Sequence, residues 1–119
     1  MGLGQLMIFV SKLETAKSFY VDLLGLKIAH DMSNEGGMLI MQNDGAYLTI
    51  HEGFQPAQAK REDCRVIPIF RVPNILEMRE KLKSNDIELH GEIIETPVHR
   101  YLTARDFDGN WIEVAQFKN

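Results

Sequence analysis

The feature that most constrains this chain is an internal repeat. The apolar positions of residues 6–20 recur 62 residues later, in 68–82, and residues 44–50 recur 64 residues later, in 108–114. Each copy begins with alternating apolar residues and then changes to helical spacing, as the first copy does at Val10. Two copies of one supersecondary unit therefore explain the 119 residues more simply than one continuous fold does.

Each copy is predicted to have the order βαβββ. The first has strands at 5–10, 26–31, 37–42 and 46–51, a helix ending at Gly25, and a hairpin turn at Asn43-Asp44-Gly45; the second has strands at 65–72, 88–94, 101–107 and 111–117 and a helix capped by Asn74. A helix on one face of a mostly antiparallel sheet leaves the other face open. We therefore predict an α+β fold of two βαβββ modules, whose curved sheets surround a cleft with the helices outside.

This architecture implies one domain over residues 1–119. Module 1 occupies about 1–53, a connector with mixed charges occupies about 54–64, and module 2 occupies about 65–119. A chain of this length can bury about two-thirds of its unfolded surface as one domain.

Composition excludes several classes of protein. With 13 Lys and Arg against 17 Asp and Glu, the net charge of −4 offers no basic face for nucleic acid. A single cysteine, Cys64, excludes an internal disulfide framework and a multi-cysteine zinc cluster. The apolar runs are too short to span a bilayer, and the first residues do not form a secretion signal. We therefore expect a cytoplasmic protein without a nucleic-acid or membrane partner.

Two stretches carry a family resemblance. Residues 10–26 form a helix with a Phe19-Tyr20 pair followed by Leu-Gly, and residues 106–114 begin with Asp-Phe-Asp-Gly-Asn, in which Phe107 stands where the family usually has proline. With the βαβββ repeat, they resemble the vicinal oxygen chelate superfamily of glyoxalase I, bleomycin resistance proteins, fosfomycin-modifying enzymes and extradiol dioxygenases. The resemblance implies a glyoxalase-like fold; it does not imply one reaction, because the superfamily supports many chemistries on one scaffold.

The resemblance also implies where metal ligands would lie. Metal-using relatives carry ligands on the first and last strand of each module, and these four positions are Gln5, Thr49, Ile67 and Glu113 in this chain. Glu113 is the one strong donor among them, and His51 could join Gln5 and Glu113 only if the strand register or a bulge brought it back to them. We therefore expect no cofactor, with a divalent Ni, Zn, Mn or Fe ion at Gln5, His51 and Glu113 as the alternative. A dioxygenase is not expected, because its site would need histidine at the position of Ile67.

Strand alternation places aromatic and polar side chains on the open faces of the sheets. The predicted ligand-binding residues are Phe9, Tyr47, Thr49, His51, Ile67, Arg71, Tyr101 and Trp111. Such a surface suits a small, partly aromatic or apolar molecule held by stacking, with arginine able to bind an anionic group. The alternative is that the apolar members of this set fill the interior or a dimer contact.

Two functions from different classes follow. The first is a resistance-type binding protein that holds a small molecule without catalysis. The second is a metal-dependent lyase or isomerase resembling glyoxalase I, with Glu113 as ligand or base. Metal-free catalysis by Glu113 or His51 is a third. The unpaired sheet edges of such modules also predict a homodimer.

Overall fold

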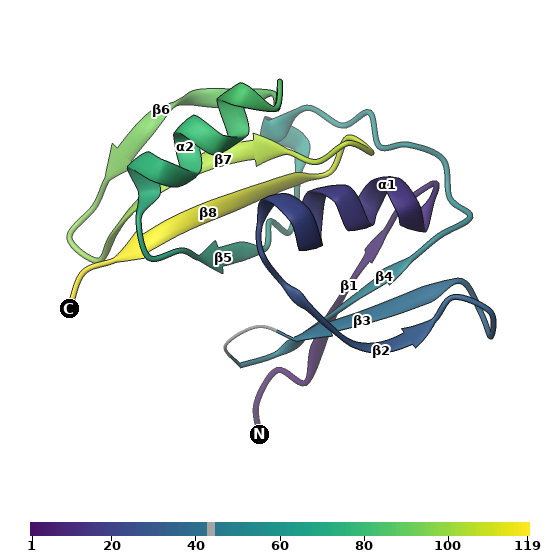
Figure 1. Cartoon of the computed structure of the whole chain (residues 1–119). Coiled ribbons are helices and arrows are strands. Elements are labelled where there is room, and N and C mark those ends of the chain that lie inside the picture. Colours follow the sequence, from purple (N-terminus) through teal and green to yellow (C-terminus); the bar gives the residue numbers. More distant parts are fainter. Residues whose placement is uncertain (43–44) are drawn as a thin grey trace. The chain divides into compact units, whose positions relative to one another are not determined.

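The computed structural model describes residues 1–42 and 45–119, so the Asn43-Asp44 part of the predicted hairpin turn lies outside the described residues. These residues divide into two compact units, Met1–Ala57 (unit 1) and Gln58–Asn119 (unit 2), each with one copy of the repeat. Each unit has the order βαβββ, which confirms the predicted α+β fold class (Figure 1).

Unit 1 is a four-stranded sheet with one helical segment. Its elements are β1 (Gln5–Phe9), α1 (Leu13–Lys17) continued by the π-helix η1 (Ser18–Leu23), β2 (Lys27–Met32), β3 (Met38–Gln42) and β4 (Tyr47–His51). The strand order is β1-β4-β3-β2, with β1 parallel to β4 and the other pairs antiparallel.

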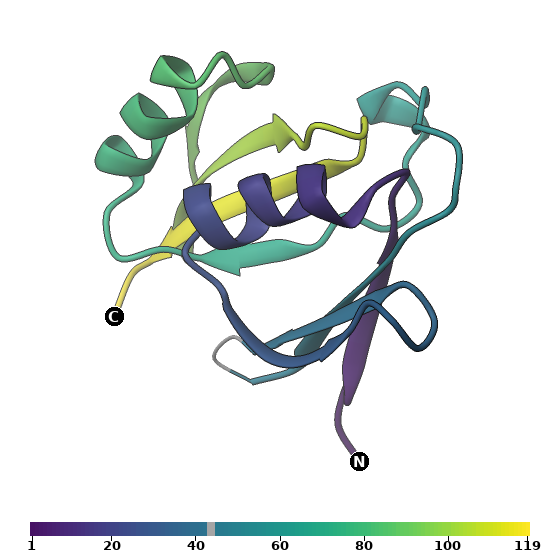
Figure 2. The same cartoon turned by 45° about the vertical axis from the view of Figure 1, so that its right-hand side comes forward.

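Unit 2 repeats this arrangement. After a short 3₁₀ turn, η2 (Arg61–Asp63), come β5 (Ile69–Arg71), α2 (Ile75–Ser84), β6 (Leu89–Glu95), β7 (His99–Arg105) and β8 (Trp111–Phe117). The strand order is β5-β8-β7-β6, and β5 is parallel to β8. Figure 2 shows α2 along one face of this sheet, where it contacts β7 and β8.

The repeat extends to the pairing of strands. Met7 lies opposite Thr49 in unit 1, and Ile69 lies opposite Glu113 in unit 2. These two pairs are related by the same offsets of 62 and 64 residues that relate the sequences. The equivalent positions of the two copies can therefore be compared residue by residue.

The prediction of a strand over 65–72 was too long at its start, because β5 begins only at Ile69. Pro68 precedes it and lacks an N–H to donate, although its carbonyl accepts a hydrogen bond of 2.9 Å from the Glu113 N–H. Ile67 therefore lies before the strand, not on it.

In each copy, the helix is also capped by a side chain that lies far from it in the sequence. The Leu13 N–H donates to the Glu52 carboxylate at 2.9 Å, and the Ile75 N–H donates to the Gln116 side-chain oxygen at 2.9 Å. Glu52 directly follows β4 and Gln116 is the second-last residue of β8, and each satisfies an N–H that its helix leaves unpaired. Asn74 also caps α2 by accepting from two backbone N–H groups, as predicted.

The first helical segment differs from a regular α-helix. Residues 18–23 form a π-helix whose Phe19 and Tyr20 rings are both fully buried, 4.9 Å apart and edge to face. The wider π turn brings these two neighbours inward together. The segment ends before Gly25, whose positive φ of 83° suits glycine at this position.

Alternation along the strands sets the faces of each sheet. In unit 1, Ile8, Leu48 and Ile50 are buried, whereas Met7 and Phe9 are exposed. In unit 2, Leu102, Ala104, Ile112 and Val114 form the corresponding buried row. Among the described residues, no helix is long and apolar enough to cross a membrane.

Candidate functional site

The open face of unit 1 carries the residues that alternation predicted there. The register of β1 and β4 places Gln5 opposite Tyr47, Met7 opposite Thr49 and Phe9 opposite His51. All six side chains share one face because residues that lie opposite each other in parallel strands project to the same side. We call this set, with Phe54, the open face of unit 1.

Three rings form a cluster at one end of this open face. The ring centroids of Phe9 and Phe54 are 4.5 Å apart, and His51 lies 5.2 Å from Phe54 and 6.0 Å from Phe9. Phe9 is 47% exposed and Phe54 42%, so the cluster presents ring surface to solvent. Tyr47 is similarly exposed on the same face. Phe54 was not among the predicted binding residues, because it follows the last strand and alternation does not extend to it.

Two polar residues of the open face satisfy each other. The Thr49 hydroxyl donates to the Gln5 side-chain oxygen at 2.8 Å, and Thr49 is 2% exposed. These are the two positions of unit 1 at which the family resemblance implies metal ligands. Here they form a neutral hydrogen-bonded pair across β1 and β4.

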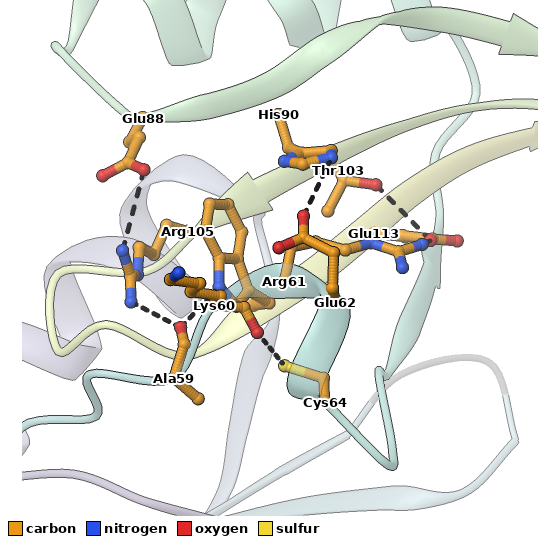
Figure 3. Close-up of polar contacts among 11 residues, drawn as sticks. Ala59, Lys60, Arg61, Glu62, Cys64, Glu88, His90, Thr103, Arg105 and Glu113 are labelled. Atoms are coloured by element: carbon orange, nitrogen blue, oxygen red, sulfur yellow. Dashed lines mark hydrogen bonds and ion pairs between the residues drawn. The ribbon is translucent and has the colours of Figure 1, made fainter.

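The corresponding face of unit 2 is covered by the chain itself. Residues 58–64, which we call the strap, cross this face (Figure 3). The Ala59 carbonyl accepts hydrogen bonds from the Trp111 indole N–H at 3.0 Å and from the Arg105 guanidinium at 2.8 Å. The same guanidinium lies 4.6 Å from the Trp111 ring centroid. Trp111, predicted to bind a ligand, is therefore 7% exposed and anchors the strap.

Glu113 lies under the strap on β8. Its Oε2 atom is 3.4 Å from the Arg61 guanidinium and accepts a hydrogen bond of 3.4 Å from the Thr103 hydroxyl (Figure 3). The Glu113 side chain is 10% exposed and that of Arg61 33%. A buried carboxylate needs such partners, because leaving water is costly for a charge.

The Arg61 side chain fits its position imperfectly. Its Nε atom is buried and has no hydrogen-bond partner among residues 1–42 and 45–119. Charge-assisted hydrogen bonds are usually about 2.7–2.9 Å long, so a single contact of 3.4 Å to Glu113 is a weak one.

Two residues that contribute to this region were missed by the sequence analysis. Arg61 lies in the connector, where no strand periodicity indicates direction. His90 was not among the predicted site residues, but β6 places it opposite Thr103, with its ring 5.8 Å from Trp111 and 4.0 Å from the Glu62 carboxylate.

A second group of rings lies farther along unit 2. The Arg71 guanidinium is 4.5 Å from the Phe117 ring centroid, and His99 lies 5.0 Å from Phe117 and 5.3 Å from Tyr101. Tyr101 pairs with Ala115, as Arg71 does, so both predicted binding residues share one face. Ile67 is half-buried and precedes β5, away from the regular alternation.

The Asp-Phe-Asp-Gly-Asn motif has a structural role in this chain. The Asp106 carboxylate accepts hydrogen bonds of 2.8 Å from the backbone N–H groups of Asp108 and Asn110, and Gly109 has a positive φ of 89°. The motif therefore forms the tight turn between β7 and β8 that positions Trp111 and Glu113.

Comparison with known proteins identifies relatives with this architecture. A model of the Glyoxalase/Bleomycin resistance protein/Dioxygenase superfamily matches residues 2–114. YetH from Bacillus subtilis (strain 168) is 26% identical over 110 residues, which cover 91% of this chain and 92% of YetH.

Two solved structures with known ligands or activities are also similar. TnmS3, an antibiotic binding protein from Streptomyces sp. CB03234, matches with a TM-score of 0.74 and 20% identity over 99% of this chain and 97% of TnmS3. A mutant of FosX, a fosfomycin resistance protein from Listeria monocytogenes, matches with a TM-score of 0.81 and 16% identity over 98% of this chain and 92% of FosX. That structure is a complex with Mn(II) and 1S,2S-dihydroxypropylphosphonic acid. At these identities the likeness shows the fold.

The residues of this chain do not fit a divalent metal of the kind bound by FosX. Gln5 and Thr49 bond to each other, Ile67 has no donor atom, and Glu113 is the one strong donor among the four positions. The described residues contain no group of three or more His, Cys, Asp and Glu side chains that could hold a metal ion. Catalytic sites for such metals usually need about three protein donors, mostly imidazole or carboxylate.

Proposed function

This chain belongs to the Glyoxalase/Bleomycin resistance protein/Dioxygenase superfamily, and we propose that within it the protein binds a small, partly aromatic or apolar molecule without catalysing a reaction. The observation that carries this proposal is the exposed ring cluster of Phe9, His51 and Phe54 on the open face of unit 1. Exposed apolar surface gathered at one place indicates a binding site more often than scattered apolar residues do.

The chemistry of the open face indicates the type of ligand. The Phe9 and Phe54 rings are tilted by 56° to each other, so a flat ligand can stack on one ring while its edge meets the other. Met7, 39% exposed, adds a flexible apolar side chain that adapts to different shapes. His51 and Tyr47 supply polar atoms at the border of this surface. We propose Arg71 and Tyr101 as a second, more polar contact surface in unit 2.

The binding role is in keeping with TnmS3, which is an antibiotic binding protein. The alternative, a metal-dependent lyase or isomerase with Glu113 as ligand or base, has less support. It requires a metal, and of the four ligand positions Glu113 alone is a strong donor, because Gln5 and Thr49 bond to each other and Ile67 has no donor atom.

The experiment is a titration with 2-naphthol, followed by NMR of the backbone amides and by calorimetry. We expect the amides around Phe9, His51 and Phe54 to shift. We expect Phe54→Ala to weaken binding about tenfold, since an aromatic contact of this kind contributes about 1–1.5 kcal/mol and 1.4 kcal/mol corresponds to a factor of ten. Phe107→Ala is the matched control, because Phe107 is 47% exposed but lies in the turn between β7 and β8.

Two outcomes would count against the proposal. Equal losses of affinity in Phe54→Ala and Phe107→Ala would show that 2-naphthol binds exposed rings without a site. Stoichiometric Ni, Zn, Mn or Fe after purification without chelator, lost in Glu113→Ala, would favour the lyase instead.

A further inference from the structure

We propose that Glu113 and Thr103 form a subsite for the ammonium, amidinium or guanidinium group of a ligand, and that Arg61 fills this subsite when no ligand is bound. The proposal concerns unit 2 alone. It goes beyond the binding of apolar molecules and does not depend on the ring cluster of unit 1.

The contact made by Arg61 shows that a planar cation fits beside Glu113. The guanidinium Nη2 atom lies 3.4 Å from Glu113 Oε2, on the face that the strap covers (Figure 3). The register of the sheet sets Thr103 directly opposite Glu113, and its hydroxyl contacts the same carboxylate oxygen. A buried carboxylate flanked by a hydroxyl group is suited to a group that carries both positive charge and N–H donors.

Arg61 is nevertheless a poor occupant of this position. It makes one long contact to the carboxylate, whereas guanidinium and carboxylate groups frequently form two short parallel hydrogen bonds. Its buried Nε atom has no hydrogen-bond partner among the described residues, a condition that buried polar atoms rarely show. A ligand cation that forms two short bonds would therefore replace a weak contact with a stronger one.

The neighbouring side chains also favour a cation. His90 lies opposite Thr103 on β6, and its ring packs edge to face against Trp111, so aromatic rings border this part of the sheet. The second guanidinium nearby, that of Arg105, is held by the carbonyls of Ala59 and Gly109 and so does not compete for Glu113.

Displacement of Arg61 does not require the strap to open. The strap is anchored through the backbone carbonyl of Ala59, and its 3₁₀ turn is closed by hydrogen bonds from the N–H groups of Asp63 and Cys64. The Arg61 side chain is 33% exposed and can turn toward solvent while these backbone contacts remain.

The test compares benzamidine with benzamide, which have nearly the same shape but differ in charge. Calorimetry or NMR titration is carried out on the full chain and on four variants: Arg61→Met, Arg65→Met, Glu113→Gln and Thr103→Val. Arg65 is exposed and lies just after the strap, so Arg65→Met is the matched control for the change in net charge. A thermal melt and an amide NMR spectrum check that each variant is folded, and Thr103→Val provides a second probe of the subsite.

We expect the unmodified chain to bind benzamidine more tightly than benzamide. Arg61→Met should tighten benzamidine binding about fivefold, because a partly exposed ion pair favours the closed arrangement by about that ratio. Arg65→Met should leave it within twofold. Glu113→Gln should remove the preference for benzamidine, and Thr103→Val should weaken it.

Three results would overturn the proposal. These are equal affinity of the two probes for the Arg61→Met variant, an equal effect of Arg61→Met and Arg65→Met, and a preference for benzamidine that survives in Glu113→Gln. The proposed function fails separately, in the 2-naphthol titration, because that titration reports on unit 1 and uses a probe without a positive charge.

Discussion

Trp111 anchors the strap over unit 2, so the effect of its mutation on strap opening can be calculated from its contacts. The variant Trp111→Phe keeps an aromatic ring beside Arg105 but removes the indole N–H that donates to the Ala59 carbonyl at 3.0 Å. A hydrogen bond of this kind contributes about 1 kcal/mol. Since 1.4 kcal/mol is a factor of ten, we expect the fraction of molecules with an open strap to rise about fivefold.

Trp111→Leu is expected to have a larger effect, because it also removes the ring beneath the Arg105 guanidinium. A cation–π contact contributes about 0.5–1 kcal/mol, so the two losses together correspond to an increase in strap opening of about 10- to 30-fold. Arg105 then retains its hydrogen bond of 2.8 Å to Ala59 as an anchor of the strap.

Amide hydrogen exchange measures this opening directly. The N–H groups of Asp63 and Cys64 donate to the carbonyls of Lys60 and Arg61, so their exchange reports on the strap. Amides of β3 and β4 report on unit 1 and should exchange at unchanged rates. Tyr101→Leu is the control, because it removes an aromatic ring from the same sheet and leaves the hydrogen bond between Trp111 and Ala59 in place.

One result would refute this reasoning. The measured quantity is the exchange rate of the Asp63 and Cys64 amides relative to that of the β8 amides. If this ratio is no higher in Trp111→Leu than in Tyr101→Leu, the strap is not held by Trp111. Faster exchange throughout unit 2, with no additional change in the strap, would lead to the same conclusion.

Three further predictions concern stability and assembly. Glu52→Ala should lower the free energy of unfolding by about 1 kcal/mol by uncapping α1, whereas Glu52→Gln should keep it close to that of the unmodified chain, since the repeat itself uses Gln116 in this role. Chemical denaturation of both variants tests this, and equal losses of stability would contradict it. Asp106→Ala should cost about 2 kcal/mol or more, because the buried carboxylate accepts two backbone N–H bonds of 2.8 Å; a change in melting temperature no larger than that of an exposed-site variant would argue against this. Light scattering should give a mass of about twice 13.6 kDa if the predicted homodimer forms, and a mass of one chain at high concentration would exclude it.

The repeat and the alternation of side chains predicted most of the fold, because both are local properties of the chain. A strand places neighbouring residues on opposite faces whatever surrounds it, so Ile8 and Ile50 could be placed inside, and Phe9 on the open face, from the sequence. The cap at Asn74 was predictable for the same reason, since its side chain accepts hydrogen bonds from residues two and three positions later.

The state of the candidate site was not predictable in this way, because its contacts join residues far apart in the chain. Arg61 reaches Glu113 across 52 positions, and Ala59 reaches Trp111 across the same separation. The connector has no periodicity, so its sequence does not indicate which of its side chains turns toward a sheet.

By itself, the sequence determined the two βαβββ copies, the faces of their sheets and the absence of strong metal donors at three of the four ligand positions. The tertiary structure decided that Trp111 is an anchor for the strap and that Glu113 is paired with Arg61. The physical reason is that a buried carboxylate requires a partner, but any nearby cation meets that requirement. Only the path of the chain selects which cation it is.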